Sequence, residues 1–106
     1  ARKHWILHSL EPQGQLVVDQ GAAQALREQG RSLLPIGINA VQGEFRPGNP
    51  VRVLGPDGKE IARGLSYYSS IEVKAIQGCK SSEIQSRLGY SYYAEVIHRD
   101  NLVLVK

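Results

Sequence analysis

The side chains best able to do acid–base or nucleophilic chemistry are three histidines and one cysteine: His4, His8, His98 and Cys79. No nucleophile motif of the Gly-x-Ser-x-Gly kind accompanies the histidines, and no base adjoins Cys79, although Lys80 beside it would lower the pKa of a thiol. The sequence also lacks the Cys/His clusters that hold zinc. We therefore expect no catalytic residue and no metal site, and we interpret His98 as a structural hydrogen-bonding residue.

The segment Gly78-Cys79-Lys80-Ser81 approaches a phosphate-binding loop without matching it. That loop needs a glycine directly before its lysine, and here a cysteine separates the two. Lys80, Ser81 and Ser82 could still hold an anion, such as an RNA phosphate, at the start of a helix. The interpretation that we favour is that one of the two serines caps that helix.

Two arginines and a short apolar loop complete the candidate contact region. Arg27 and Arg31 lie near the end of a predicted helix, where the backbone dipole favours positive charge whatever the function. The loop from residue 34 to residue 38 follows directly and would place backbone amides beside them. The candidate RNA or anion contacts are Arg27, Arg31, Leu34, Pro35, Ile36, Gly37, Lys80, Ser81 and Ser82.

Adjacent tyrosines occur twice, at Tyr67-Tyr68 and at Tyr92-Tyr93. Exposed beside basic residues, they would offer stacking platforms for unpaired bases. Because neighbouring residues of a strand point to opposite faces, we expect one tyrosine of each pair to be buried in the core or in an interface. We expect Trp5 to be a buried anchor of an N-terminal strand.

These residues must be positioned by short strands and helices. Apolar runs predict strands over residues 5–9 and 16–19, and a helix follows that is capped by Asp19 and ends at Gly30. Further strands are predicted over residues 38–45, 51–54 and 59–66. The first two are separated by a Pro-Gly-Asn-Pro turn, and the last two are joined by a Gly-Pro-Asp-Gly hairpin.

The C-terminal third is predicted to hold two short helices and a hairpin. Ser69 to Glu72 fits a capping box that opens a helix ending at Gly78. A second helix carries Ile84 and Leu88 on one face and ends at Gly89. Residues 92–98 and 102–105 then predict a closing hairpin, so that the chain as a whole is expected to be mainly β with short helices, in the α+β class.

Length and composition exclude several classes of protein. With 106 residues the chain makes one domain, and its net charge of +3 is spread along the sequence without a basic run. Residues 32–43 form the longest stretch free of charged side chains, too few to span a membrane. A lone cysteine indicates a reducing compartment, and we expect the chain to be cytoplasmic. Because methionine is absent, we interpret the sequence as a fragment of a larger protein or as one that has lost its initiator.

Several motifs carry a resemblance to a known family. Residues 2–6 (Arg-Lys-His-Trp-Ile), 14–19, 32–38, 58–65, 80–84 and 98–104 resemble the PUA domain that ends bacterial glutamate 5-kinases. The last three segments are specific to that subfamily, whereas the central turn and residues 62–65 look like PUA domains generally. The likeness spans essentially the whole chain, residues 1–106, as a single PUA domain.

This resemblance implies a PUA-like pseudo-barrel of mostly antiparallel strands. It also implies a C-terminal appendage excised from a larger amino acid kinase, whose absent kinase domain phosphorylates glutamate with ATP and Mg²⁺ in proline biosynthesis. Other PUA domains bind RNA through a small glycine-rich loop after the first helix. This sequence departs from that pattern, because Pro35-Ile36-Gly37-Ile38 is bulkier.

Three functions remain open at this stage. We favour a regulatory or architectural module that packs on the kinase domain of the parent chain or on a neighbouring subunit, with no cofactor of its own. An RNA-binding module is the alternative, since the chain has a pI near 9.2 and basic residues beside the loop. An independent enzyme is ranked last.

Overall fold

A five-stranded mixed sheet forms the centre of the molecule. The computed structural model describes residues 2–105 and orders the strands β2-β1-β3-β4-β5. β1 runs parallel to β3, and the other neighbouring pairs are antiparallel. The strands are β1 (Gly14–Val18), β2 (Ile38–Gly43), β3 (Pro50–Leu54), β4 (Glu60–Leu65) and β5 (Leu102–Leu104).

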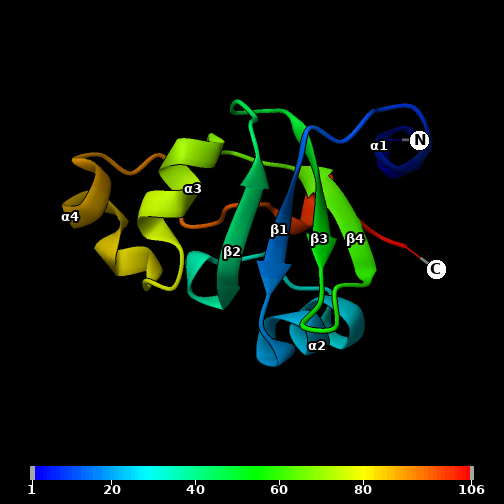
Figure 1. Cartoon of the computed structure of the whole chain (residues 1–106), viewed down its shortest axis with the longest axis horizontal. Coiled ribbons are helices and arrows are strands. Elements are labelled where there is room, and N and C mark those ends of the chain that lie inside the picture. The colour runs from blue at the N-terminus through cyan, green and yellow to red at the C-terminus, as the bar shows by residue number, and fades with distance from the viewer. Residues whose placement is uncertain (1, 106) are drawn as a thin grey trace.

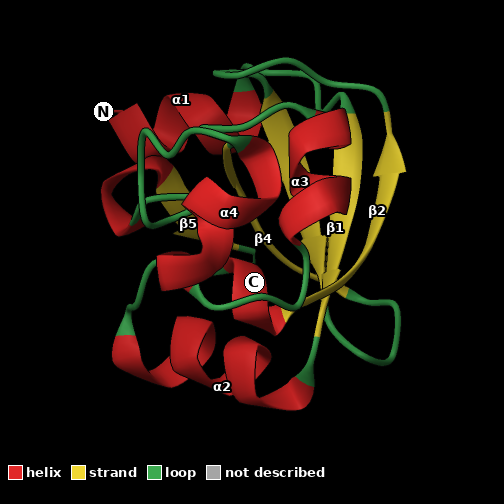
Figure 2. Ribbon diagram, turned by 90° about the vertical axis from the view of Figure 1, so that its left-hand side faces the viewer, coloured by secondary structure: helices red, strands yellow, loops and turns green. Residues whose placement is uncertain are grey.

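Short helices surround this sheet. α1 lies at the same end as both termini, α3 and α4 lie at the opposite end, and α2 lies across the lower ends of the strands (Figure 1). Figure 2 shows the sheet curving from β2 on one side to β5 on the other, as in a pseudo-barrel. These elements are α1 (Arg2–His8), α2 (Gln20–Gln29), α3 (Ser70–Ile76) and α4 (Ile84–Leu88), with 3-10 turns η1 (Pro35–Gly37), η2 (Ser81–Glu83) and η3 (Arg99–Asn101).

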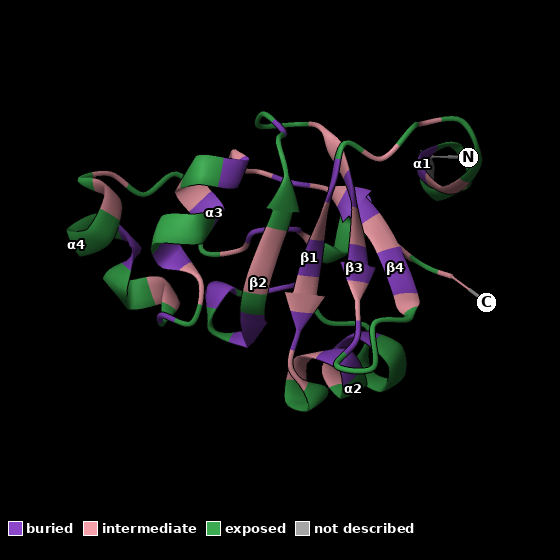
Figure 3. Ribbon diagram, in the orientation of Figure 1, coloured by how far each residue is buried: buried purple, intermediate pink, exposed green. Residues whose placement is uncertain are grey.

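The core lies against one face of the sheet, and burial alternates from residue to residue along β1 and β3. Leu16 and Val18 of β1 and Val51 and Val53 of β3 are fully buried, while the residues between them face outward (Figure 3). This two-residue period is what a sheet with one covered face requires. The architecture confirms the predicted α+β class.

The N-caps predicted for α2 and α3 are confirmed. The Asp19 side chain accepts a hydrogen bond from Ala22 N at 2.7 Å at the start of α2, and Gly30 ends that helix with φ +61°. In the capping box of α3, Ser69 N donates to Glu72 Oε1 at 2.7 Å and Glu72 N donates to Ser69 Oγ at 3.2 Å. Each cap satisfies amides that have no partner within the helix.

The predicted N-terminal strand over residues 5–9 is wrong, since these residues belong to α1 and the turn after it. A short apolar run does not distinguish strand from helix by its period, and tertiary packing decides here. Ile6 of α1 is fully buried, whereas Trp5 is 53% exposed, so Trp5 is not the buried anchor that we expected.

The predicted closing hairpin is also wrong. Residues 92–98 form no strand, and β5 pairs with β4 instead. The segment is held by one bridge between Ile97 and Leu33 and by the phenol oxygen of Tyr68, which accepts hydrogen bonds from Tyr92 N and Tyr93 N. A side chain therefore takes the amides that a hairpin partner would have paired.

The described residues, 2–105, include no helix with the length and apolarity needed to cross a membrane.

Candidate ligand surface beside helix α2

A groove of about 380 Å³ lies between α2 and η1. Leu34 and Ile36 line this α2–η1 groove, and their side chains are 41% and 51% exposed, which is high for large apolar residues. Its walls are mainly apolar and include Ala22, Ala25, Leu26, Leu33, Leu34 and Ile36. The groove fits an apolar or aromatic group better than a highly charged one.

Gly37 allows η1 to approach the first turn of α2 closely. Asp19 N donates to Gly37 O at 2.9 Å, and a Cβ placed on Gly37 would stand only 2.5 Å from the Ala22 Cβ. Real carbon atoms do not approach so closely without displacement, so a glycine is required here by space. The predicted candidate Gly37 thus shapes the groove through its lack of a side chain.

A second hollow of about 320 Å³ adjoins the groove and shares Arg31, Ser32 and Leu34 with it. Arg99 completes the cationic side of this Arg31–Arg99 hollow, which His98 also lines, and Glu95 is its carboxylate. Arg99 N donates to Ser32 Oγ at 2.8 Å, which ties η3 to the segment after α2. An apolar groove and two guanidinium groups therefore share one surface, which suits a ligand with an anionic and an apolar part.

The predicted role of His98 is confirmed. Its Nδ1 accepts a hydrogen bond from Asp100 N at 3.1 Å and thereby caps η3. Sequence reasoning missed Arg99 and Glu95 as members of this surface. The signal is absent from the local sequence, because contacts between distant segments, the bridge between Leu33 and Ile97 and the bond from Arg99 N to Ser32 Oγ, bring these residues together.

The structure brings together only some of the predicted contact residues. Arg31, Leu34, Ile36 and Gly37 line the α2–η1 groove, and Pro35 is buried inside η1. Arg27 lies apart, since its Nη2 would stand 3.9 Å from a Cβ on Gly55 in the β3–β4 hairpin. Neighbouring arginines of one helical end thus serve different surfaces.

Lys80, Ser81 and Ser82 lie at the start of η2 and line neither hollow. The predicted helix over this region exists, but the predicted serine cap is wrong. Ser81 Oγ donates to Ala94 O at 2.7 Å, and the carboxylate of Glu83 accepts from Lys80 N at 2.8 Å instead. Ser81 therefore anchors the irregular segment 92–98, and Ser82 and Lys80 are exposed.

Cys79 does not behave as the sequence suggested. Its side chain is buried, and burial raises the pKa of the thiol, with Arg87 opposing and Glu83 adding to this change. The expected lowering by Lys80 is wrong. A buried, protonated thiol is a poor nucleophile and is part of the core.

The tyrosines differ between the two pairs. Tyr68 is fully buried and Tyr67 half-buried, as predicted, but Tyr92 and Tyr93 are both exposed, so the prediction for the second pair is wrong. The ring of Tyr93 stacks on that of Tyr67, with centroids 3.8 Å apart and 19° between planes. The irregular backbone of residues 92–98 removes the strand alternation on which the prediction depended.

Tyr90 is fixed by a carboxylate. Its hydroxyl donates a short hydrogen bond to Glu72 Oε2, and this bond raises the pKa of Tyr90 to about 12. Because the same Glu72 also closes the capping box of α3, the bond links the tyrosine segment to that helix.

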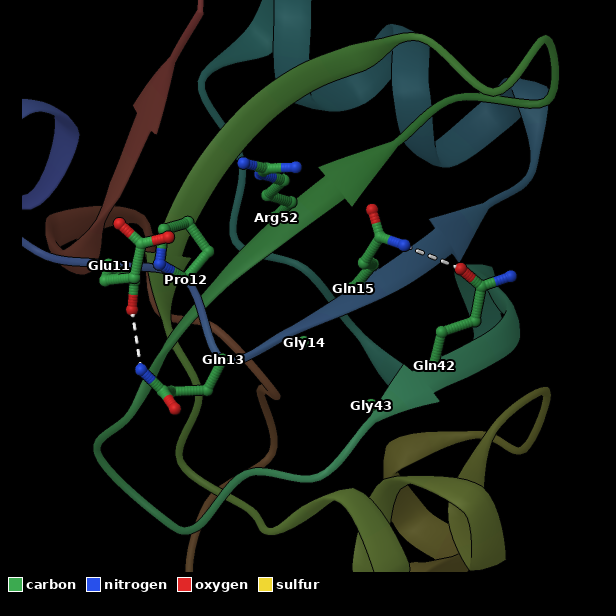
Figure 4. A pocket seen from close by; sticks show the side chains of 8 residues that line it. All are labelled: Glu11, Pro12, Gln13, Gly14, Gln15, Gln42, Gly43 and Arg52. Atoms are coloured by element: carbon green, nitrogen blue, oxygen red, sulfur yellow. Dashed lines mark hydrogen bonds between the residues drawn. The ribbon is translucent and has the colours of Figure 1, made fainter.

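A polar hollow of about 330 Å³ lies on the open face of the sheet (Figure 4). Gln15 Nε2 donates to Gln42 Oε1 at 2.8 Å across β1 and β2, and Arg52 of β3 lies on the other side of Gln15 (Figure 4). Gln13 is occupied by a bond to the backbone oxygen of Glu11. The hollow is hydrophilic and wide open, and its amides bond to one another. Within residues 2–105, no cluster of three or more His, Cys, Asp or Glu side chains has the arrangement of a metal site.

Comparisons with known proteins add to this geometry. A profile of the PUA domain family matches residues 14–88. Over 104 residues the chain is 58% identical to a glutamate 5-kinase of Trichlorobacter lovleyi, which covers 98% of this chain but 28% of that protein. The chain thus spans less than a third of the length of this relative.

Two solved structures share the fold. A PUA domain from Aeropyrum pernix K1, determined as a tartrate complex, superimposes with a TM-score of 0.60 at 23% identity, covering 81% of this chain and 41% of that one. A chain of the archaeal box H/ACA sRNP Nop10–Cbf5 complex superimposes with a TM-score of 0.56 at 16% identity, covering 94% and 25%.

Proposed function

Since the chain belongs to the PUA domain family and matches the C-terminal module of glutamate 5-kinases, we propose that it is a regulatory or architectural domain of such a kinase. The phosphorylation of glutamate by ATP and Mg²⁺ belongs, in this proposal, to a separate kinase domain of the same polypeptide. The partner of the module is that kinase domain or a neighbouring subunit. We also propose that the whole protein works in the cytoplasm.

One observation carries the proposal. The 58% identity extends over 98% of this chain but over only 28% of the relative. The likeness is therefore to a module and not to a whole kinase. The side chains of this module support a role without catalysis. Cys79 is buried and protonated, and His98 is occupied in capping η3.

Removal of the module from the full-length kinase tests the proposal. We expect the shortened enzyme to keep phosphoryl transfer to glutamate but to change its KM, its inhibition by the end product or its oligomeric mass. Steady-state kinetics and light scattering measure these quantities. If kinetics, inhibition, mass and thermal stability all stay unchanged, the proposal is wrong.

The isolated chain provides a second assay. Mixed with ATP, Mg²⁺ and glutamate, it should give no turnover above a blank, because the phosphoryl-transfer groups lie elsewhere in this proposal. Reproducible turnover by the pure chain would instead assign it an active site.

RNA binding is a second candidate function, favoured by the Arg31–Arg99 hollow beside the apolar groove. Two guanidinium groups suit phosphates, and the groove suits a sugar or base. Lys80 at the start of η2 and Tyr92 are exposed as well, but neither lines the groove or the hollow.

A charge-matched pair of variants tests this alternative. Arg31→Ala should weaken RNA binding and reduce the slope of log K against log salt by about 1, the share of one phosphate contact. Arg27→Ala removes the same charge four positions earlier in the chain, but Arg27 lies in α2 beside the β3–β4 hairpin, so this variant should leave binding unchanged. Equal effects of the two variants would indicate a general charge effect without a site.

A further inference from the structure

Another groove lies between α1 and the sheet edge, away from the surface beside α2. It has a volume of about 760 Å³ and is lined by His4, Leu7 and His8 of α1, by Arg63 of β4, and by residues 103–105. We call it the α1–β5 groove. In Figure 1 it belongs to the end of the molecule that holds both termini.

α1 is fixed firmly to the domain, so this groove has a defined shape. Ile6 is fully buried beneath the helix, and Arg63 Nη1 donates to Leu7 O at 3.2 Å. Arg63 is held in turn by Glu60, whose Oε2 lies 2.5 Å from Arg63 Nε, and this hydrogen bond raises the pKa of the guanidinium. The direction in which the chain enters α1 is therefore set by the structure.

Two large apolar side chains are left open at this end. Trp5 on α1 is 53% exposed and Leu104 on β5 is 40% exposed. Leu7 and Val103, which line the groove with Leu104, are half-buried, and Trp5 lies on α1 outside the lining residues. Tryptophan is among the residues most enriched in the energetic centres of protein interfaces, and an open tryptophan on a well-fixed helix fits such a role.

We propose that the α1–β5 groove, with Trp5 and Leu104, is the docking site for the polypeptide that precedes α1 in the kinase. This inference rests on the proposed function, because it takes the chain as the C-terminal module. The module aligns with 28% of the relative's length, at its C-terminal region. In such a kinase roughly 70% of the polypeptide therefore precedes α1.

The dimensions of the molecule favour this end over the others. The domain measures 36 × 25 × 22 Å, and α3 and α4 stand at the far end of the long axis (Figure 1). A body tethered directly to α1 has a high effective concentration at the α1–β5 groove, and this concentration falls with distance from the tether. Burial of Trp5 and Leu104 against that body would add apolar contact, and no long linker would be needed to reach them.

Tryptophan accessibility in the full-length kinase tests the inference. Trp5 is the only tryptophan of this chain, so replacement of any tryptophans in the kinase domain by phenylalanine isolates its signal. The reference is Tyr92→Trp in a Trp5→Phe background, because Tyr92 is 70% exposed and follows α4, the helix at the end away from both termini. We expect iodide to quench Trp5 several-fold less than the reference. Equal quenching would overturn the inference.

Amide exchange gives an independent readout. Trp5→Ser in the full-length kinase should increase exchange at residues 103–105 several-fold, whereas the control Tyr92→Ser should not. If Trp5 is shielded only at high protein concentration, a second copy covers the groove and the inference is wrong. Trp5 could be shielded in an enzyme whose kinetics and assembly do not change when the module is removed. That result would support the docking site and contradict the proposed function.

Discussion

Substitution of Gly37 tests most directly how the α2–η1 groove is built. An alanine Cβ at this position would stand 2.5 Å from the Ala22 Cβ, and Gly37 has no positive φ, so space alone opposes the change. Overpacking of a well-packed site by one methyl group costs about 1–3 kcal/mol. We therefore expect Gly37→Ala to lower the free energy of unfolding by about 2 kcal/mol, the middle of that range.

A double-mutant cycle with Ala22 separates this clash from other effects. Ala22→Gly alone should cost about 1 kcal/mol, because glycine is a poor residue inside α2. In the double variant the obstructing Cβ is gone, so Gly37→Ala should add little further loss. The coupling free energy between the two positions should then be about 2 kcal/mol.

Urea unfolding followed by far-UV circular dichroism measures these free energies, with an unchanged m-value as the sign that only stability has altered. For a domain of this size each 1 kcal/mol lowers Tm by about 4–8 °C, so Gly37→Ala should also be evident in a thermal scan. If Gly37→Ala stays within about 0.5 kcal/mol of the wild type, or the two substitutions are additive, the close approach of η1 to α2 does not constrain the fold.

Three further outcomes are expected. Tyr68→Phe removes a buried phenol hydroxyl that is hydrogen-bonded to the backbone of Tyr93. The change should lower the free energy of unfolding by about 2 kcal/mol and speed amide exchange at residues 92 and 93; unchanged exchange would contradict this. Because the Glu72 bond raises the pKa of Tyr90 to about 12, above the ordinary value of 10, the stability from this bond is present below pH 10 and lost as pH rises to 12. Tyr90→Phe should flatten that part of the stability profile, and an unaltered profile would refute the assignment. Burial raises the pKa of the Cys79 thiol, so a thiol reagent at pH 8 should react at the rate of unfolding; rapid reaction of the native chain would argue against a buried thiol.

The amino-acid sequence by itself determined the features that depend on hydrogen bonds between near neighbours. Asp19 caps α2, Ser69 and Glu72 form a capping box, and the Gly55–Gly58 turn closes the β3–β4 hairpin, with Gly58 at φ +82°. Each of these structures is completed within four residues, so the residue types and their spacing are sufficient to predict it. The family motifs were readable for the same reason, since they are strings of consecutive residues.

The tertiary structure alone decided which of these residues meet. Arg27 and Arg31 stand four positions apart, yet Arg27 approaches the β3–β4 hairpin while Arg31 joins Arg99 through the bridge between Leu33 and Ile97. Packing on the sheet edge made residues 2–8 helical, and the phenol of Tyr68 kept residues 92–98 out of a hairpin. These outcomes depend on contacts between segments that are far apart in the sequence, as in Tyr68 with Tyr93, 25 residues apart, and Ser32 with Arg99, 67 residues apart. No local pattern records such contacts.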